Sequence, residues 1–232
     1  MSDKFIRSMR FWPFHRSEQQ SIQQANPSST KCKKVYSIIE LPKPKVSGGL
    51  PLADALSKRR SLRNFLFERI SDQQLSDLLW SACGISSERK SGDEIKYLHT
   101  NPTACNHQEV VVYVFMHGGV FLYDSIKNCL LQIKKKDYRS KLSKLEIIQK
   151  SEINLCLVSD LSKMIRFDDH FRRDMYSSLD VGYVSENIYL YCAANNLATC
   201  ACGLIHRETI LKILGLSRAK AFLVHPIGKA FN

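Results

Sequence analysis

The segment from Val181 to Ala194, VGYVSENIYLYCAA, is apolar on nearly every side when it is drawn as a helix. A helix of that kind has no solvent face of its own, so other elements must cover it. We therefore expect a central, fully packed helix around which the rest of the chain is arranged. Gly182 lowers the helix propensity of this segment, and we expect it to allow a close approach by a neighbouring element.

Five apolar segments predict strands. Two of them flank His117-Gly118-Gly119 and predict a β-hairpin. The strands are expected at residues 34–40, 109–115, 120–124, 153–159 and 221–229. Because the hairpin comes early and long helices separate the later strands, we expect an α+β fold with a mixed, mainly antiparallel sheet flanked by helices.

Three further helices carry end signals. Ser71 and Gln74 form a capping box at the start of SDQQLSDLLWSACG, and Gly84 is expected to end that helix. Pro51 begins a short helix that ends in a basic cluster, where the helix dipole favours cations. The amphipathic segment RETILKILGL is expected to end at Gly215.

The 232 residues suffice for one large domain or two small ones. Residues 1–45 are Ser/Gln-rich after an aromatic start, and we expect a partly disordered arm with one short strand. A Pro/Gly linker near 46–49 then leads into a domain over residues 46–232. We expect no signal peptide and no membrane span, because the apolar runs are too short. An amphipathic surface anchor is the alternative for the aromatic start, although Pro13 interrupts a long helix.

The formal net charge of +12 favours anionic partners such as nucleotides, phosphate cofactors, nucleic acid or an acidic membrane surface. Eight cysteines without a C-x-x-C motif, several inside apolar runs, favour free thiols in a reducing, cytoplasmic setting over a disulfide scaffold. The Cys200-x-Cys202 pair suggests a metal or redox site. Apart from His206, no further Cys or His follows the pair at a spacing typical of zinc sites, so we expect no metal.

The segment SKRRSLRNF, residues 57–65, concentrates positive charge at the end of a short helix. Arg59, Arg60 and Arg63 supply forked donors that match phosphate oxygens, and Ser61 adds a short one. The segment could therefore wrap one anion. On charge alone, a solvated basic helix end is the favoured interpretation.

Two other segments have groups suited to a flat polar ring. Asn106 and Gln108 bracket His107, and their amides both donate and accept hydrogen bonds, as the edge of an isoalloxazine requires. The alternative is that Asn106 and Thr103 cap the loop. In LATCACGLIHRE, small residues and Gly203 let the backbone approach a flat ligand, or pack under a neighbouring helix.

Taken in order, these segments resemble the flavin-dependent nitroreductases, especially the small branch similar to azoline-oxidising dehydrogenase components. The resemblance covers about residues 38–232 and rests on six segments in the family order and spacing. They are RRSLRNF (59–65), LSDLLWSACGI (75–85), TNPTACNHQEVVVYV (100–114), GVFLYD (119–124), DVGYVSENIYLYCAANNLAT (180–199) and HPIGK (225–229). Departures include Glu186 where the family has Gln and His99 where Arg is usual.

The resemblance implies a nitroreductase-like fold and a homodimer that binds FMN at its interface, with both subunits contributing to each pocket. It implies that the arginine segment holds the phosphate and the flavin's polar edge, in place of the solvated helix end favoured on charge alone. The implied cofactor-binding residues are Arg59, Arg60, Ser61 and Arg63; Pro102, Thr103, Asn106 and Gln108, the loop coming from the other subunit; Cys202 and Gly203 beside the ring; and Gly228 and Lys229 near the phosphate.

The implied chemistry belongs mostly to the cofactor. NADH or NADPH would reduce the flavin, and a nitroaromatic, a quinone or a similar flat acceptor would then take the electrons in a ping-pong cycle. No catalytic side chain and no metal are expected. One alternative is a flavin-dependent oxidase or dehydrogenase of a peptide or specialised metabolite. The other is a binding protein, either a non-catalytic flavin-binding protein or a basic nucleic-acid binder. Nucleic-acid binders interleave aromatic and basic residues, and this pattern is lacking outside the N-terminal arm.

Overall fold

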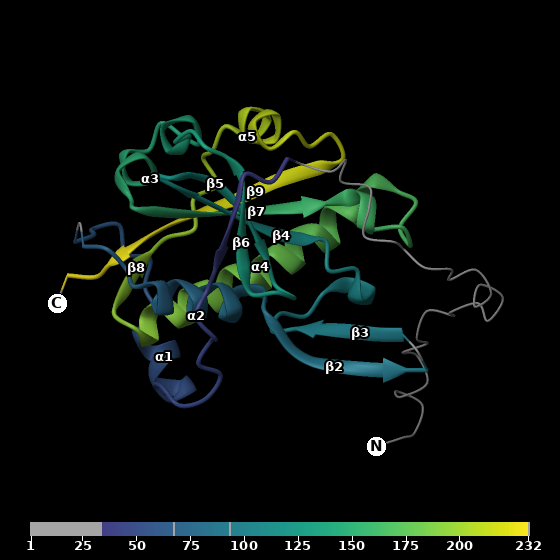
Figure 1. Cartoon of the computed structure of the whole chain (residues 1–232), viewed down its shortest axis with the longest axis horizontal. Helices are drawn as coiled ribbons and strands as arrows, with labels where there is room; N and C mark the ends of the chain where they lie inside the picture. The colour runs from purple at the N-terminus through teal and green to yellow at the C-terminus, as the bar shows by residue number, and fades with distance from the viewer. Residues whose placement is uncertain (1–33, 67, 93, 232) are drawn as a thin grey trace, which may run out of the picture. The chain divides into compact units, whose positions relative to one another are not determined.

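The computed structural model describes residues 34–66, 68–92 and 94–231 (Figure 1). The chain divides after Cys32, and the compact unit begins at Lys33. That start is earlier than the boundary expected near Val46, because strand β1 (Ser37–Glu40) is hydrogen-bonded into the main sheet. Residues 1–33 of the expected arm lie outside the described residues.

A seven-stranded sheet forms the centre of the unit, in the order β1-β6-β5-β4-β7-β9-β8. Its other strands are β4 (Val110–Met116), β5 (Gly119–Asp124), β6 (Cys129–Lys134), β7 (Ile153–Asp160), β8 (Leu197–Thr199) and β9 (Ala219–Lys229). Every pairing between the described strands is antiparallel. The α+β class and the mainly antiparallel sheet are therefore confirmed, whereas the parallel pair that a mixed sheet needs is not found among these strands.

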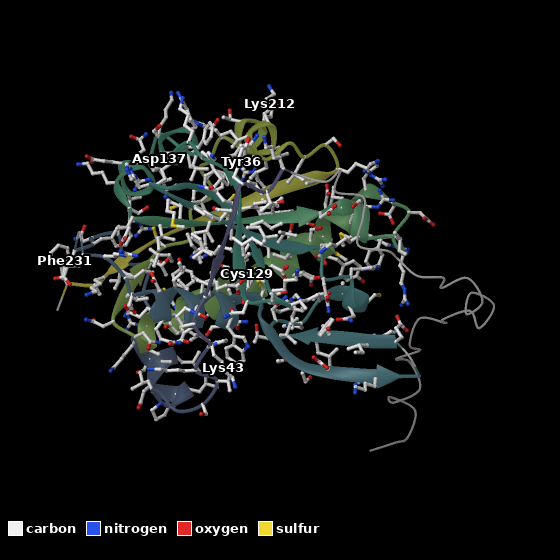
Figure 2. All side chains as sticks on the ribbon, viewed as in Figure 1. Tyr36, Lys43, Cys129, Asp137, Lys212 and Phe231 are labelled. Atoms are coloured by element: carbon white, nitrogen blue, oxygen red, sulfur yellow. The ribbon has the colours of Figure 1, made fainter. Side chains whose placement is uncertain are left out.

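Helices cover both faces of the sheet, giving three layers (Figure 1). Because side chains alternate along a strand, Val112 and Val114 belong to one apolar cluster and Tyr113 and Phe115 to another. The first cluster includes side chains of α2 (Asp72–Cys83) and α4 (His170–Ala194). The second includes α3 (Glu146–Lys150) and α5 (Arg207–Leu214), while α1 (Leu52–Lys58) packs beside α4. Figure 2 draws the described side chains on the same view of the fold.

The predicted helix ends are confirmed where local signals were strong. At the start of α2, Ser71 Oγ accepts from the N–H of Gln74, and the Gln74 side chain accepts from the N–H of Ser71, both at 3.1 Å. Gly84 follows the helix, where a Cβ would collide with Trp80. Gly215 ends α5 with a φ of 66°, a left-handed conformation that glycine adopts without strain.

The central helix differs from its prediction. α4 begins at His170 after the N-cap Asp169, and Val181, Val184 and Ile188 are buried against the sheet. Its opposite side is uncovered in the single chain: Met175, Leu179 and Tyr183 are 38%, 49% and 45% exposed. Within the predicted segment, Gly182, Tyr183 and Glu186 are exposed, so the expectation of a fully packed helix is wrong for the single chain. The expected close approach at Gly182 is also wrong, since no atom lies within 4 Å of a Cβ built there.

A separate two-stranded sheet, β2 (Ile85–Ser91) and β3 (Glu94–His99), was not predicted (Figure 1). Ser91 pairs with Glu94, so two positions form the turn, and Gly92 has a φ of 60°. This hairpin leads from α2 into the polar loop over residues 100–109. Short 3₁₀ turns occur at Ala104–Asn106, Arg139–Lys141 and Leu161–Lys163. Among the described helices, none combines the length and the apolar character that crossing a bilayer requires.

Candidate functional site

The first group of predicted site residues lies directly after α1. The N–H of Leu62 donates to the carbonyl of Thr199 at 2.9 Å, which ties the segment to the end of β8. Ser61 Oγ and the Tyr189 hydroxyl share a hydrogen bond of 3.0 Å. The Arg59 guanidinium lies over the Tyr189 ring, 5.4 Å from its centroid, a cation–π contact. The arginine segment is therefore fixed against both α4 and β8.

The three arginines of this segment carry charge that no described acidic side chain neutralises by an ion pair. Arg60 donates to the carbonyls of Ser57 and Arg59, and Arg63 has a long 3.5 Å contact to the carbonyl of Ser61. Guanidinium groups held by neutral partners keep their attraction for an anion. The arrangement suits phosphate binding.

Tyr189 also joins this segment to Cys202 and Gly203. Its hydroxyl accepts a 2.7 Å hydrogen bond from the N–H of Ala201, and the sulfur atoms of Cys200 and Cys202 lie 3.5 Å apart. The hydrogen bond from Cys202, aided by the Arg63 charge, lowers the pKa of Cys200 to about 7. The same hydrogen bond raises the pKa of Cys202. Within the described residues, no three His, Cys, Asp or Glu side chains are arranged to hold a metal ion.

Gly228 and Lys229, at the end of β9, lie beside the continuation of the same segment. The N–H of Leu66 donates to the carbonyl of Lys229 at 2.9 Å. A Cβ on Gly228 would stand 2.8 Å from Phe65, so packing against Phe65 already accounts for this glycine. Lys229 Nζ is 2.8 Å from the Glu68 carboxylate. Its charge is therefore less available to a phosphate than those of the arginines.

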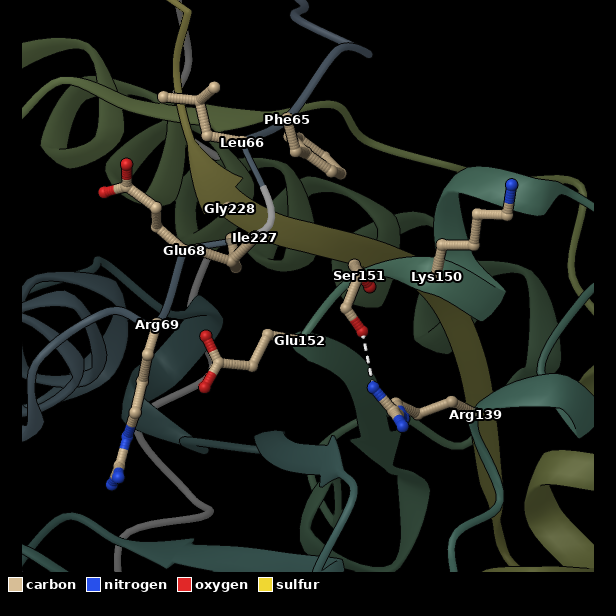
Figure 3. Close-up of a pocket in the computed structure, with 10 residues that line it drawn as sticks. All are labelled: Phe65, Leu66, Glu68, Arg69, Arg139, Lys150, Ser151, Glu152, Ile227 and Gly228. Carbon is tan, nitrogen blue, oxygen red and sulfur yellow. Dashed lines mark hydrogen bonds between the residues drawn. The ribbon is translucent and has the colours of Figure 1, made fainter.

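A pocket of about 290 Å³ is lined in part by Phe65 and Gly228 (Figure 3). Its walls carry charges of both signs, and several of these are already engaged: Arg139 donates to the carbonyl of Ser151 at 2.8 Å, and Glu152 accepts from the N–H of Ile70 at 3.2 Å. Of the predicted site residues, it contains Gly228 alone. This pocket is therefore not the predicted cofactor site.

The second group of predicted residues lies in the loop over residues 100–109. Thr103 Oγ1 accepts from the N–H of Gln108 at 2.9 Å, and the Gln108 amide donates to Asn106 Oδ1 at 3.1 Å. Cys105, Asn106 and Gln108 all have φ between 50° and 54°, which is unusual for residues with side chains. Thr103 thus caps the loop, as the alternative interpretation required, and Asn106 lies beside Gln108.

Buried polar atoms without a hydrogen-bond partner are concentrated in this loop. Among the described residues, they belong to Asn101, His107 and Glu109. Burial raises the pKa of Glu109 to about 8, and the nearby carboxylate of Asp180 adds to that effect. Burial also raises the pKa of Asp180. Unsatisfied buried groups call for a partner, which a ligand or a second chain could supply.

The two groups are well separated within the single chain. The loop is attached to α4 through Asp180, whose Oδ2 accepts from the N–H of Ala104. The arginine segment is attached to the same helix through Tyr189. Asp180 and Tyr189 are nine positions apart in α4, which corresponds to about 14 Å along the helix axis. At about 100° per residue, the two anchors project from opposite flanks of the helix. One chain therefore brings Arg59, Ser61 and Cys202 together but holds the loop apart.

Sequence reasoning missed several residues that hold the site. Tyr189 lies within the central-helix segment and Asp180 directly before it, and a polar residue in or next to such an apolar segment is the signal that could have found them. Glu109 stands at the start of an apolar strand in the same way. His225 is buried with hydrogen bonds to Ser185 at 2.9 Å and Thr199 at 3.1 Å, and burial lowers its pKa to about 3.

Comparison with known proteins adds an independent result. The sequence model of the nitroreductase family matches residues 56–229. A protein from Methanocaldococcus jannaschii, provisionally named a nitroreductase, is 26% identical over 192 residues, which cover 78% of this chain and 91% of the relative.

Solved structures have the same fold. A crystal structure from Ralstonia eutropha JMP134, provisionally named a nitroreductase, matches with a TM-score of 0.74 and 28% sequence identity. The match covers 84% of this chain and 90% of the Ralstonia chain. A second, from Desulfovibrio desulfuricans, provisionally named a nitroreductase and solved in complex with FMN, has a TM-score of 0.56 and 17% identity. It covers 80% of this chain and 89% of its own, and at that identity the likeness concerns the fold alone.

Proposed function

Because the chain belongs to the nitroreductase family, we propose that it binds FMN and passes electrons from NADH or NADPH to a nitroaromatic, a quinone or a similar flat acceptor. The observation that carries this proposal is the arginine segment after α1. Its three guanidinium groups have no acidic partner among the described residues: Arg59 lies over the Tyr189 ring, and the charge of Arg63 acts on Cys202. The segment RRSLRNF is the one that resembles the family's arginine motif. The FMN-bound structure of similar fold supports the choice of cofactor.

The donor set of this segment fits the phosphate end of FMN. Arg59, Arg60 and Arg63 would supply charge-assisted hydrogen bonds, and Ser61 would supply its hydroxyl, which Tyr189 already orients. Gly203, which is exposed next to buried Cys202, would leave the backbone open to the ring. Gly228 and Lys229 would lie at the edge of the phosphate site, with Lys229 held partly by Glu68.

A second protomer would complete the site. The uncovered side of α4 carries Met175, Leu179 and Tyr183 at helical spacing, with open space at Gly182, and an apolar stripe of that kind suits a two-fold interface. The pocket would then have two walls: the arginine segment of one protomer, and the loop of the other protomer with Pro102, Thr103, Asn106 and Gln108. The unsatisfied polar atoms in that loop support this arrangement.

FMN, when bound, supplies the hydride and electron transfer. The chain's own residues would bind the phosphate, orient the ring and exclude water. The guanidinium groups would place positive charge where negative charge develops on reduction, which favours the reduced form. His99 contributes no such charge, because burial lowers its pKa to about 4 and leaves it neutral near pH 7.

Titration of the full-length protein with FMN, followed by flavin fluorescence, tests the cofactor. We expect Arg59→Ala to weaken binding by about 10- to 100-fold, because a charge-assisted hydrogen bond contributes roughly 1.5–3 kcal/mol. Arg69→Ala is the matched control, since Arg69 is exposed and pairs with Asp72 outside this group. A wild-type protein that binds no FMN would contradict the proposal.

Light scattering at several protein concentrations tests the two-protomer site. We expect Leu179→Asp to lower the fraction of dimer and the affinity for FMN together. Ile126→Asp is the control, because Ile126 is an exposed apolar residue in the turn between β5 and β6. A variant that is monomeric yet binds FMN as tightly as the wild type would contradict a shared pocket.

An anaerobic titration with NADH tests the electron donor. Rapid bleaching of the flavin band, reversed by a quinone, is expected for the proposed activity. A flavin that stays oxidised with both NADH and NADPH would instead favour a dehydrogenase of a peptide or a specialised metabolite.

A further inference from the structure

Cys200 and Cys202 differ from the other buried cysteines. Their sulfur atoms lie 3.5 Å apart, and the two residues are 2% and 7% exposed. Residues i and i+2 of an extended segment face the same side, which places both thiols together just after β8. By contrast, burial raises the pKa of Cys83 and of Cys156 to about 12, so these act as inert core residues.

The surroundings of the pair favour one thiolate. The Cys202 thiol is within hydrogen-bond distance of the Cys200 sulfur, and the Arg63 charge favours loss of a proton from both. Gly203, the next residue, is exposed, so the pair lies only one residue below the surface. A low-pKa thiol next to a second thiol is the arrangement of redox-active cysteines.

We propose that Cys200 and Cys202 form a dithiol that a hydroperoxide oxidises reversibly to a disulfide. The Cys200 thiolate attacks the peroxide oxygen, an S–O bond forms, the O–O bond breaks, and the alkoxide leaves and takes up a proton. The Cys202 thiol then attacks the resulting sulfenic acid, which forms the S–S bond and releases water. In total, two thiols and one hydroperoxide give one disulfide, one alcohol and one water. An external dithiol reverses the reaction by exchange.

The local structure allows this change and transmits it. The sulfur atoms must close from 3.5 Å to roughly 2 Å. Two hydrogen bonds between Cys202 and Val224, of 2.9 and 3.0 Å, hold the Cys202 backbone, so the movement falls on Cys200 and Ala201. Because the N–H of Ala201 is bonded to Tyr189, oxidation would disturb the contact that orients Ser61. A bridge across one residue restricts the unfolded chain little, so it is easily reduced.

Peptide mapping of the full-length protein tests the proposal. The protein is treated with hydrogen peroxide, denatured, labelled with N-ethylmaleimide and digested with trypsin. The tryptic peptide that starts at Asp174 contains Cys192, Cys200 and Cys202, so Cys192 is an internal control for a buried thiol. We expect the peptide to lose two labels and two hydrogen atoms while Cys192 stays labelled. Dithiothreitol before labelling restores both labels.

Two variants test the order of attack. In Cys202→Ser, we expect dimedone to trap a sulfenic acid at Cys200, and in Cys200→Ser we expect Cys202 to stay unmodified. Full labelling of both cysteines after peroxide, or equal oxidation of Cys192, would overturn the proposal. If a variant does not fold, the labelling of the wild-type tryptic peptide still tests whether the disulfide forms. The readout counts thiols and needs no FMN, so its failure is distinct from a failure to bind flavin.

Discussion

Asp180 and Ala104 are 76 positions apart in the sequence and are joined by a 2.7 Å hydrogen bond, in which the Asp180 carboxylate accepts from the backbone N–H of Ala104. Asp180 is only 2% exposed, so this bond is shielded from water. It attaches the loop over residues 100–109 to the middle of α4. The conformation of the loop therefore depends on a carboxylate in the core.

Replacement of that carboxylate should release the loop. We expect Asp180→Ala to raise the hydrogen-exchange rate of the Ala104 amide and to lower the free energy of unfolding by about 1–3 kcal/mol. Asp180→Asn keeps an acceptor and should retain most of the protection. Asp174→Ala is a control on the same helix, where the half-exposed Asp174 pairs with Lys220 of β9. Unchanged exchange at Ala104 in Asp180→Ala would contradict the anchoring role.

Stability should fall with rising pH because of Glu109. Its pKa is raised from 4.5 to about 8, mainly by burial and further by Asp180, with Lys163 opposing. Between these values the folded state holds more protons than the unfolded state, so the free energy of unfolding decreases as pH rises through that window.

Urea unfolding at several pH values measures this effect. Glu109→Gln removes the titrating group, so its stability relative to the wild type should rise by roughly 1–3 kcal/mol between about pH 5 and pH 8.5. Parallel pH profiles of the two proteins would show that Glu109 does not change its protonation state in that range.

Gly228→Ala should destabilise the fold. The added methyl would lie 2.8 Å from Phe65, and both residues are held in place by hydrogen-bonded neighbours, so the cost should be about 1–3 kcal/mol. In Gly118→Ala the methyl would lie 3.8 Å from Phe121, an ordinary contact, and the change should be much smaller. Thermal unfolding of the two variants gives the comparison, and equal losses would rule out the steric explanation.

Tyr189→Phe should loosen the arginine segment. Without the hydroxyl, the N–H of Ala201 loses its acceptor and Ser61 loses its partner, at a cost of about 1–2 kcal/mol. Tyr36→Phe is the control, because Tyr36 lies just before β1, outside the site, and is 43% exposed, so loss of its hydroxyl should change little. A double-mutant cycle with Ser61→Ala should show positive coupling between Ser61 and Tyr189. Strict additivity would mean that their hydrogen bond contributes nothing.

Much of the fold was predictable because its signals are local. The capping box at Ser71 and Gln74 and the glycine at position 215 specify helix ends within a few residues, and the continuous apolar, β-branched run before Met116 specifies a buried strand. The β2–β3 hairpin was missed because its strands are mostly polar and exposed, so they lack the apolar alternation that marks a half-buried strand. The uncovered side of α4 was missed because the sequence shows that a residue is apolar but not whether its own chain or another molecule buries it.

The site was predictable only in part for a similar reason. The arginine segment is contiguous in sequence, and its proximity to Cys202 followed from the resemblance. The contacts that fix it run through Tyr189, and those that fix the loop run through Asp180, over long sequence separations that no local pattern encodes. The pairing of Lys229 with Glu68 was likewise invisible.

Strand β9 has a consequence for how such a protein can vary. Its first residue, Ala219, pairs with Asp160, whose N–H donates to the carbonyl of Glu109 below the loop. Its other end, at Lys229, holds Leu66 next to the arginine segment. One strand therefore sets the span between both regions. Its register against β7 already shifts by one residue between Leu157 and Val158, and a further insertion or deletion of one residue would invert the inward and outward side chains beyond it. Diversification of ligand preference is thus confined to the connecting loops, while the length of β9 has to stay constant.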